Sequence, residues 1–215
     1  MVAELDADHD PGTEPAGEIV TLTDGGRVLV RPLLPSDRGE LARRYLELSP
    51  AARRLRFFNA PDHLSEPVLD YLMDVDNRDR VALVAFALDD DDRPGVGIAR
   101  YVRDRHDPTC AEAAVTVLDA YHRRGIGTLL LHRLAETAAA NGIATFTASV
   151  MWENRDLLDG LRAFGAEITP GEPGVASIRV ALPEPDAEAP ATDIHHALRV
   201  FATRIGEQIG LKFTR

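Results

Sequence analysis

The segment between residues 109 and 151 restricts the fold of this chain more than any other. Two runs, TCAEAAVTVLD (109–119) and IATFTASVM (143–151), read as strands. The sequence between them, TLLLHRLAETAAANG, has the apolar spacing of a helix that stops at Asn141-Gly142. Parallel strands need a crossover connection of this kind, usually a helix. The segment therefore predicts a parallel strand pair with a helix packed on the sheet.

The rest of the chain predicts further strands and helices, separated by turn signals. Two strands flank the turn Asp24-Gly25-Gly26. Short loops join the early strands and helices separate the late ones, which predicts a mixed sheet, antiparallel early, with helices on both faces and an α/β (α+β) fold class. The other expected elements are helices at 35–49, 50–58, 65–75 and 154–165, strands at 80–88 and 96–104, and a hairpin at 167–183.

Two details of the helices are specific enough to check. In the helix after the glycine turn, counted from Thr128, the buried face is expected to hold Leu131, Leu134, Ala135 and Ala138. Ser36 or Asp37 is expected to cap the helix at 35–49, since both side chains can accept a hydrogen bond from a free helix amide.

Charge and composition exclude several classes of protein. A net charge of −11 argues against a nucleic-acid partner, which calls for a basic footprint. No apolar run approaches the ~20 residues that span a bilayer, and no secretory signal is apparent, so we expect no membrane partner. The single cysteine, Cys110, excludes an internal disulfide framework. These features predict a cytoplasmic protein.

The two ends differ from the centre. Residues 1–17 are acidic and rich in Pro and Gly, which predicts a disordered tail ahead of a folded domain at 18–183. Residues 184–192 resemble a linker, and 193–215 predict an amphipathic helix. Its apolar stripe must be buried on its own domain, in a homodimer, or over the acceptor cleft as a lid, and the sequence does not choose among them.

The stretch YHRRGIG (121–127) joins the predicted strand to the helix. The first amides of a helix lack intrahelical partners, and the helix dipole makes that end favourable for anions. Gly125 and Gly127 remove side chains that would keep an anion from those amides, and His122, Arg123 and Arg124 add positive charge. The pattern predicts phosphate binding. It matches neither a Walker loop nor a GxGxxG fingerprint, and an ordinary tight turn is the alternative.

Residues 122–127, with the helix and the stretch ENRDLLDGLRAFGA that follow, resemble the GNAT superfamily of N-acyltransferases. Its acyl-CoA loop has the form [Gln/Arg]-x-x-Gly-x-[Gly/Ala], and His122 departs from the first position. The resemblance covers about residues 18–182 and implies the GNAT mixed sheet with acetyl-CoA as co-substrate and no metal. It also implies that the diphosphate rests on the loop, that the pantetheine arm pairs with the main chain of the strand before it, and that an asparagine steadies the chain. The residues that would do this are Val115, Val117, His122, Arg123, Arg124, Gly125, Ile126, Gly127, Thr128 and Asn154.

Several segments are more closely similar to the bacterial Pat-type protein lysine acetyltransferases of this superfamily. They include RPLLPSDRGEL, LSPAARRLRFF, DRVALVAF and AEAAVTVLDAYHRRGIG. The resemblance implies a protein substrate that presents a lysine. It also implies that the glutamate at this place in the strand, Glu112, is the general base. The helix-capping role of Asn154 is an alternative to coenzyme binding, and both can hold.

The chemistry of acyl transfer independently points to Glu112. An alkyl ammonium has a pKa of about 10.4, so a carboxylate at the cleft is needed to accept its proton near neutrality. On a strand, Glu112, Ala114 and Thr116 share one face, opposite Ala113, Val115 and Val117. A glutamate at the solvent edge of a strand is the alternative.

Two questions stay open in the sequence. Many relatives place a tyrosine seven residues after the asparagine to protonate the departing thiolate, but this chain has Leu161 there. Ser149 and Cys110 are weak substitutes. The acceptor is also undefined: besides a protein lysine, a small-molecule amine or a non-catalytic acyl-CoA-sensing module remain alternatives.

Overall fold

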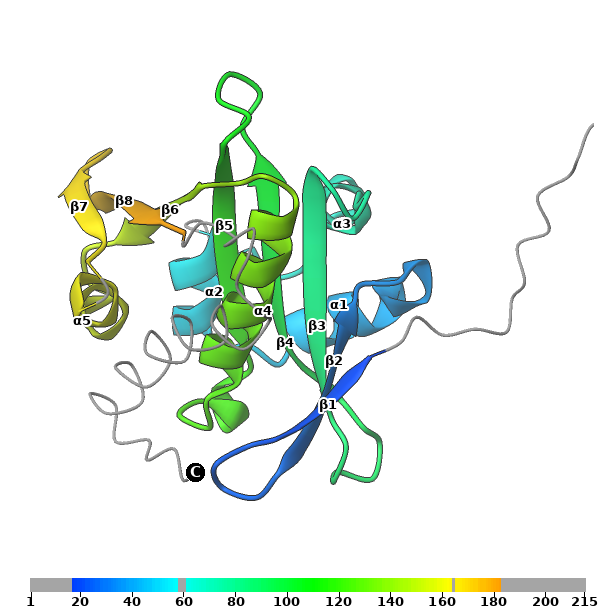
Figure 1. The fold of residues 1–215 in the computed structure, drawn as a ribbon. Coiled ribbons are helices and arrows are strands. Elements are labelled where there is room, and N and C mark those ends of the chain that lie inside the picture. Colours follow the sequence, from blue (N-terminus) through cyan, green and yellow to red (C-terminus); the bar gives the residue numbers. More distant parts are fainter. Residues whose placement is uncertain (1–16, 58–60, 164, 183–215) are drawn as a thin grey trace, which may run out of the picture.

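The structure is a computed structural model that describes residues 17–57, 61–163 and 165–182. Figure 1 shows this part as coloured ribbon. The predicted tail at 1–17 (apart from Gly17), the linker at 184–192 and the helix at 193–215 lie outside the described residues, so the expectations for them stay predictions.

The order of elements follows the turn signals of the sequence. The strands are β1 (Glu18–Thr21), β2 (Arg27–Pro32), β3 (Arg80–Ala87), β4 (Gly95–Arg103), β5 (Cys110–Val117), β6 (Thr145–Met151), β7 (Glu167–Pro170) and β8 (Val175–Ala181). The helices are α1 (Arg38–Tyr45), α2 (Pro50–Phe57), α3 (Glu66–Met73), α4 (Ile126–Ala140) and α5 (Arg155–Ala163), with short 3-10 turns at Pro35–Asp37 and Asp119–Tyr121.

The strands form one mixed sheet in the order β1-β2-β3-β4-β5-β6-β8-β7. Every neighbouring pair is antiparallel except β5 and β6, which are parallel and joined through α4. The expected mixed sheet, with its parallel pair in the 109–151 region, is confirmed.

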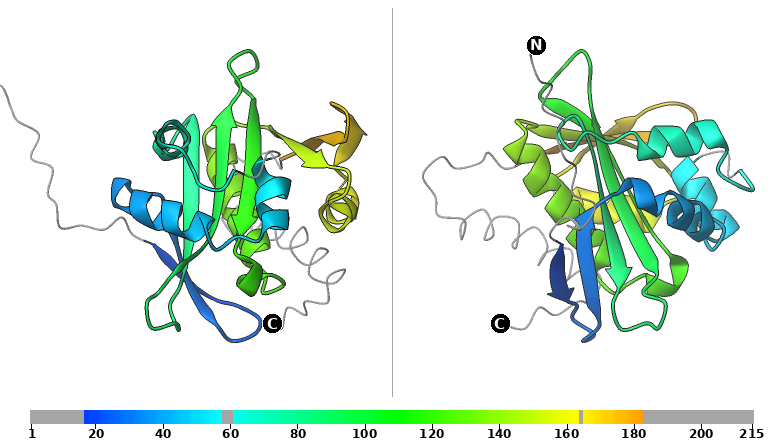
Figure 2. Two further views of the ribbon diagram at one scale, coloured as in Figure 1. Left: turned by 180° about the vertical axis from the view of Figure 1, so that it is seen from behind. Right: turned by 90° about the vertical axis from the view of Figure 1, so that its right-hand side faces the viewer.

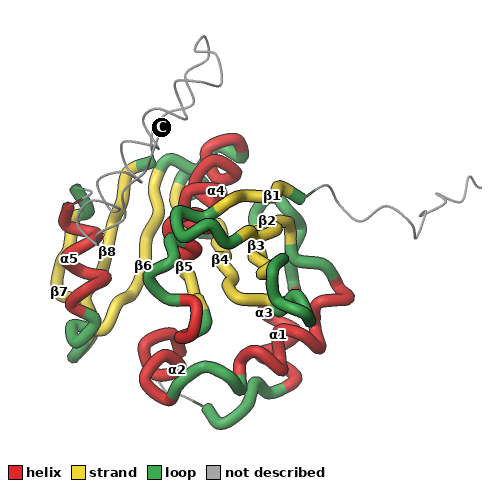
Figure 3. Tube along the Cα trace, turned by 90° about the horizontal axis from the view of Figure 1, so that it is seen from below, coloured by secondary structure: helices red, strands yellow, loops and turns green. Residues whose placement is uncertain are grey.

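Helices cover both faces of the sheet, as expected. Helix α4 packs on β3, β4 and β5 from one side, whereas α1, α2 and α3 lie on the other (Figures 1 and 3). Figure 2, turned by 90°, shows the sheet edge-on between these two layers. Helix α5 packs on the residues of β6 and β8 that face the same side as α4.

Helix α4 buries one stripe against the sheet. Ile126, Leu130, Leu134 and Ala138 are each at most 1% exposed and follow an i, i+4 row. Leu134, Ala135 and Ala138 were expected there, but Leu131 is wrong, because Leu130 is the buried residue and Leu131 is only partly buried. The helix begins at Ile126, two residues before Thr128, and this start sets the phase of the stripe.

Asp37 stands at the N-terminus of α1 but does not cap it with its side chain. Its carboxylate instead accepts two hydrogen bonds from the Arg31 guanidinium, at 2.7 and 2.8 Å, and one from the Leu34 amide at 2.8 Å. Both side chains of this ion pair are about 10% exposed or less. The aspartate therefore fastens the start of α1 to β2 rather than capping a helix.

Candidate active site

Strands β5 and β6 separate part-way along their length. They pair at Cys110–Thr145, Ala111–Phe146 and Glu112–Thr147, and no further pairing follows although β5 runs on to Val117 and β6 to Met151. Beyond Glu112, β5 has no paired strand on the side where β6 lies. The result is an open strand edge in the middle of the sheet.

The main-chain groups on this open edge can be assigned from the ladder between β4 and β5. At one end of the ladder the Leu118 amide donates to the Val96 oxygen, and at the other the Asp104 amide donates to the Cys110 oxygen. Because hydrogen-bonded pairs alternate along an antiparallel ladder, the even-numbered residues of β5 direct their amides and carbonyls to β4. Val115 and Val117 direct theirs to the opposite side, where β6 has separated. An extended chain could pair there as an added strand.

The predicted phosphate loop begins directly after β5 and ends as α4 begins. Gly125 is the N-cap of α4 with φ 86°, and Arg123 is also left-handed, with φ 60°. No side chain caps the helix, and its first intrahelical donor is the Leu129 amide, which bonds to the Gly125 oxygen at 2.9 Å. Left-handed residues placed among right-handed ones gather successive amides into an anion-binding concavity. The main chain of residues 123–128 thus has the form of an anion site.

The basic side chains of the loop are arranged differently from one another. Arg124 donates through Nε to Asp24 in the β1–β2 turn at 2.5 Å, and its guanidinium lies over the Tyr121 ring. His122 bonds through Nε2 to the Val117 oxygen at 2.9 Å. Arg123 is exposed. The loop is therefore tied to the β1–β2 hairpin and to the end of β5.

Glu112 lies at the point where β5 and β6 separate. It is exposed, and it shares a strand face with Ala114 and Thr116, both of which line a pocket on the α1 and α2 side of the sheet. Val115 and Val117 pack instead against the core beneath α4. The predicted division of β5 into two faces is thus present, with Glu112 on the face opposite α4.

Helix α2 bridges the ends of the two separated strands. At its N-terminus, the Ser49 amide and hydroxyl donate to the Asp119 carboxylate, just beyond β5, at 2.9 and 2.8 Å. Further along α2, Arg54 forms an ion pair at 3.2 Å with Glu153, just beyond β6. Asn154, which follows Glu153, directly precedes α5, and its main-chain oxygen accepts from the Leu158 amide. Asn154 thus stands beside the open edge and at a helix N-terminus.

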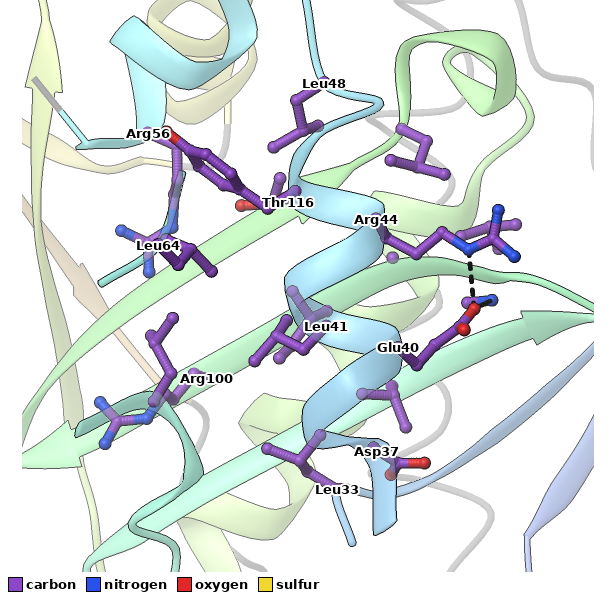
Figure 4. A pocket seen from close by; sticks show the side chains of 18 of the residues that line it. Leu33, Asp37, Glu40, Leu41, Arg44, Leu48, Arg56, Leu64, Arg100 and Thr116 are labelled. Carbon is purple, nitrogen blue, oxygen red and sulfur yellow. Dashed lines mark hydrogen bonds and ion pairs between the residues drawn. The ribbon is translucent and has the colours of Figure 1, made fainter. Parts of the chain in front are cut away.

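Figure 4 shows the pocket on the α1 and α2 side of the sheet, with α1 crossing in front of the strands. It holds about 790 Å³ of empty space, part of which is open to solvent. Most of its walls are apolar, and they include Leu41, Tyr45, Phe57, Phe86 and Ile98. Such a cavity beside the open edge can receive an apolar molecule next to the face that carries Glu112.

Two pocket residues were missed in the sequence, Arg56 of α2 and Arg100 of β4. Arg56 stands among other arginines in RRLRF and resembles a solvated helix face. Arg100 interrupts the otherwise apolar strand GVGIARYVR, and a charge in the middle of such a strand is the signal that could have identified it.

The residues considered for thiolate protonation occupy different surroundings. Leu161 is partly buried against the cluster of Val150 and Leu158. Cys110 is buried, its Sγ donates to Asp107 and it accepts from Arg179, which is a structural arrangement. Ser149 is exposed, two residues beyond Thr147 on the same face of β6.

The described residues contain neither a metal-binding cluster nor a membrane-spanning helix. No group of three or more His, Cys, Asp and Glu side chains is placed there to hold a metal ion. None of the helices in this part of the chain combines the length and apolar character that a bilayer crossing needs.

Sequence comparison gives the same family for the matched segment. Residues 45–164 match the family model described as the acetyltransferase (GNAT) family. The chain is 36% identical over 148 residues to acetyltransferase PA5475 of Pseudomonas aeruginosa, which covers 68% of this chain and 78% of that protein. It is 31% identical over 169 residues to acetyltransferase Pat of Mycolicibacterium smegmatis. That match covers 78% of this chain and 49% of Pat, so the chain corresponds to about half of that relative.

Structural comparison agrees with the sequence. The GNAT domain of Streptomyces lividans PAT superposes with a TM-score of 0.71 at 28% identity, over 79% of this chain and all of that domain. The described fold is thus shared with that GNAT domain. The chain belongs to the acetyltransferase (GNAT) family and lies close to its Pat-type members.

Proposed function

We propose that this acetyltransferase moves the acetyl group of acetyl-CoA to lysine amines of proteins, with Glu112 as the general base. The observation that carries the proposal is the position of Glu112. It stands where β5 and β6 separate, on the strand face that Ala114 and Thr116 share with the pocket. The likeness to Pat proteins supports a protein substrate.

Acetyl-CoA supplies the activated acetyl group, and the chain supplies its placement. The main chain of residues 123–128 would hold the diphosphate, because unpaired helix amides favour anions. The main-chain groups of Val115 and Val117 would pair with the pantetheine arm, which fixes the thioester beside β5. A donor held this way reacts with an amine as if the two were one molecule, and this lowers the barrier.

Glu112 would act on the acceptor rather than on the donor. Its exposed carboxylate can take a proton from the lysine ammonium, directly or through one water, and the neutral amine then attacks the thioester carbon. The Val117 amide, on the open edge, would donate to the oxygen on which negative charge develops. A thiol has a pKa of about 8.5 and leaves adequately as a thiolate, so Leu161 in place of a tyrosine leaves solvent to protonate it.

The test is mass spectrometry of a lysate from the protein's own cell, incubated with the full chain and acetyl-CoA. We expect new acetyl-lysines on proteins with the wild type, and a background level with Glu112→Gln. Acetylation of a panel of small amines without acetyl-lysine on proteins would replace the protein substrate by a small molecule. Coenzyme binding without any acetylated product would instead favour the sensing module.

A further inference from the structure

The pocket in Figure 4 carries two arginines at one end. The guanidinium groups of Arg56 and Arg100 both lie on the side away from the Glu40–Arg44 ion pair. Arg56 comes from α2, which lies over the sheet, and Arg100 comes from strand β4 of the sheet itself, so the two side chains enter the pocket from different elements. Glu112 lies two residues before Ala114 on the same face of β5, and its negative charge stabilises the charged form of Arg56.

Arg100 is deeply buried and incompletely bonded. It is 6% exposed, and its Nη2 donates to the main-chain oxygens of Tyr71 and Asp74 at 3.0 and 3.3 Å. Its guanidinium carbon lies 4.5 Å from the centre of the Tyr71 ring. Its Nε is buried and has no hydrogen-bond partner among the described residues. A buried donor without an acceptor is costly, and a ligand that supplies one removes that cost.

Arg56 has no ion pair with any described residue, and its charge is poorly compensated. Its guanidinium lies over the Phe57 ring. Burial lowers the pKa of Arg56; the charge of Glu112 opposes this shift, while that of Arg100 adds to it. Of these two charges only that of Glu112 stabilises the Arg56 guanidinium, and its carboxylate is exposed. This end of the pocket favours an additional negative charge.

The remaining walls determine what kind of anion fits. Apart from Asp37, Glu40, Arg44 and Thr116, the other lining residues are glycines and aliphatic or aromatic residues, among them Leu41 and Leu64. A guanidinium is matched in shape and charge by a carboxylate. We propose that this pocket is a binding site for a small organic anion, a single carboxylate on an apolar frame, with the carboxylate between Arg56 and Arg100.

This site is compatible with, but does not rest on, the proposed protein substrate. A lysine ammonium can reach exposed Glu112 from solvent without passing the buried Arg100. An ammonium at the arginine end of the pocket would be repelled by the charges of Arg56 and Arg100, which disfavours a cationic occupant there. The binding test below requires no acetyl transfer, so it can fail or succeed independently of the enzyme's activity.

The test uses the full chain, calorimetry and four probes. Phenylacetate has the proposed chemistry, phenylacetamide is its neutral analogue, phenethylamine is a cationic analogue, and inorganic phosphate is an anion without an apolar frame. We expect phenylacetate to bind at least tenfold more tightly than each of the others. Arg56→Gln should remove most of that preference, whereas Arg54→Gln, on the same helix but paired with Glu153, should leave it unchanged.

Arg100→Gln should abolish the preference as well, but it also removes the bonds to the end of α3, so circular dichroism must show that the variant is folded. Arg56→Gln carries the test if it is not. Equal binding of phenylacetate and phenylacetamide, binding of neither at millimolar concentration, or an unchanged preference in Arg56→Gln would each overturn the proposal.

Discussion

The imidazole Nε2 of His122 lies 2.9 Å from the main-chain oxygen of Val117. A carbonyl oxygen only accepts hydrogen bonds, so Nε2 carries the proton and donates. His122, the first residue of the predicted phosphate loop, is therefore hydrogen-bonded to Val117, the last residue of β5. This bond uses one of the two lone pairs of an oxygen on the open edge, so the other lone pair and the Val117 amide are left for the pantetheine arm that is proposed to pair there.

We expect His122→Ala to lower the stability of the fold by about 1 kcal/mol, the net value of one hydrogen bond. The affinity for CoA should change by less than about threefold, because the loop is proposed to hold the diphosphate through main-chain amides rather than through this ring. Thermal unfolding and calorimetric titration with CoA measure the two effects. A loss of affinity above tenfold would mean that the imidazole itself contacts the coenzyme.

The two loop glycines should respond differently to alanine. Gly125 has φ 86°, a conformation that costs an L-residue about 1 kcal/mol, so Gly125→Ala should distort the loop and weaken CoA binding at least tenfold. At Gly127 an added methyl group would meet only Val117 Cγ2, at 3.5 Å, which is an ordinary contact. Gly127→Ala should therefore leave the loop undistorted and weaken CoA binding less than Gly125→Ala does. Calorimetry on both variants checks this, and equal losses would contradict it.

Much of the fold could be predicted because turn chemistry marks the ends of its elements. Asp24-Gly25-Gly26 indicates a hairpin, and Gly25 indeed adopts φ 87° between β1 and β2. It was harder to predict which face of α4 is buried. A helix counted from Thr128 was expected to bury Leu131, whereas the helix begins at Ile126 and buries Leu130. The two-residue difference in the start of the helix is decided by loop geometry, which the local sequence does not show.

The candidate site was predictable only in its local part. The loop and Glu112 lie within 17 residues of one another and share one strand–turn–helix unit, so a local pattern indicates both. The separation of β5 from β6 depends on the whole sheet. Arg56 and Arg100 belong to elements far apart in sequence, and they line one pocket only because α2 packs on the sheet at β5, which no local sequence pattern indicates.

The buried and the exposed ion pairs of β2 provide a matched test of stability. Asp37 pairs with Arg31 in the interior, and Asp89 pairs with Arg27 at the surface, at 2.7 and 2.6 Å. Asp37→Asn leaves a buried guanidinium without its carboxylate and should cost about 3–5 kcal/mol. Asp89→Asn should cost less than about 1 kcal/mol, because solvent screens that pair. Urea unfolding measures both, and similar costs would contradict the assignment of Arg31 and Asp37 as a buried pair.

Asp37 should also make the free energy of unfolding depend on pH in the acid range. Burial alone would raise the pKa of Asp37, but the hydrogen bonds from Arg31 and the Leu34 amide, with the charge of Arg31, hold it below its usual value. The unfolded chain, in which this carboxyl has a pKa of about 3.9, binds the proton more readily than the folded one. The stability that the Asp37 carboxylate contributes is therefore fully present above that pKa, and it is lost as the pH falls through the lower pKa of the folded state. The stability difference between wild type and Asp37→Asn should therefore be largest above about pH 5 and shrink toward pH 3. Unfolding free energies across this range test it, and a constant difference would contradict it.

Glu112→Gln keeps the shape of the side chain and removes its ability to accept a proton. We expect kcat for a lysine acceptor to fall by about 10²–10⁴-fold at neutral pH, the usual contribution of a general base, while the affinity for CoA stays within twofold. Glu153→Gln is the matched control, an exposed glutamate just beyond β6 that pairs with Arg54, and its kcat should change by less than about twofold.

The pH dependence separates a base from a merely structural glutamate. As pH rises toward the amine pKa of about 10.4, more of the acceptor loses its proton to solvent and the need for a protein base disappears. The ratio of wild-type to Glu112→Gln rates should therefore narrow steadily between about pH 7 and pH 10. A structural glutamate would depress the rate by a similar factor at every pH in that range, and a ratio that does not narrow would remove Glu112 from the proton transfer.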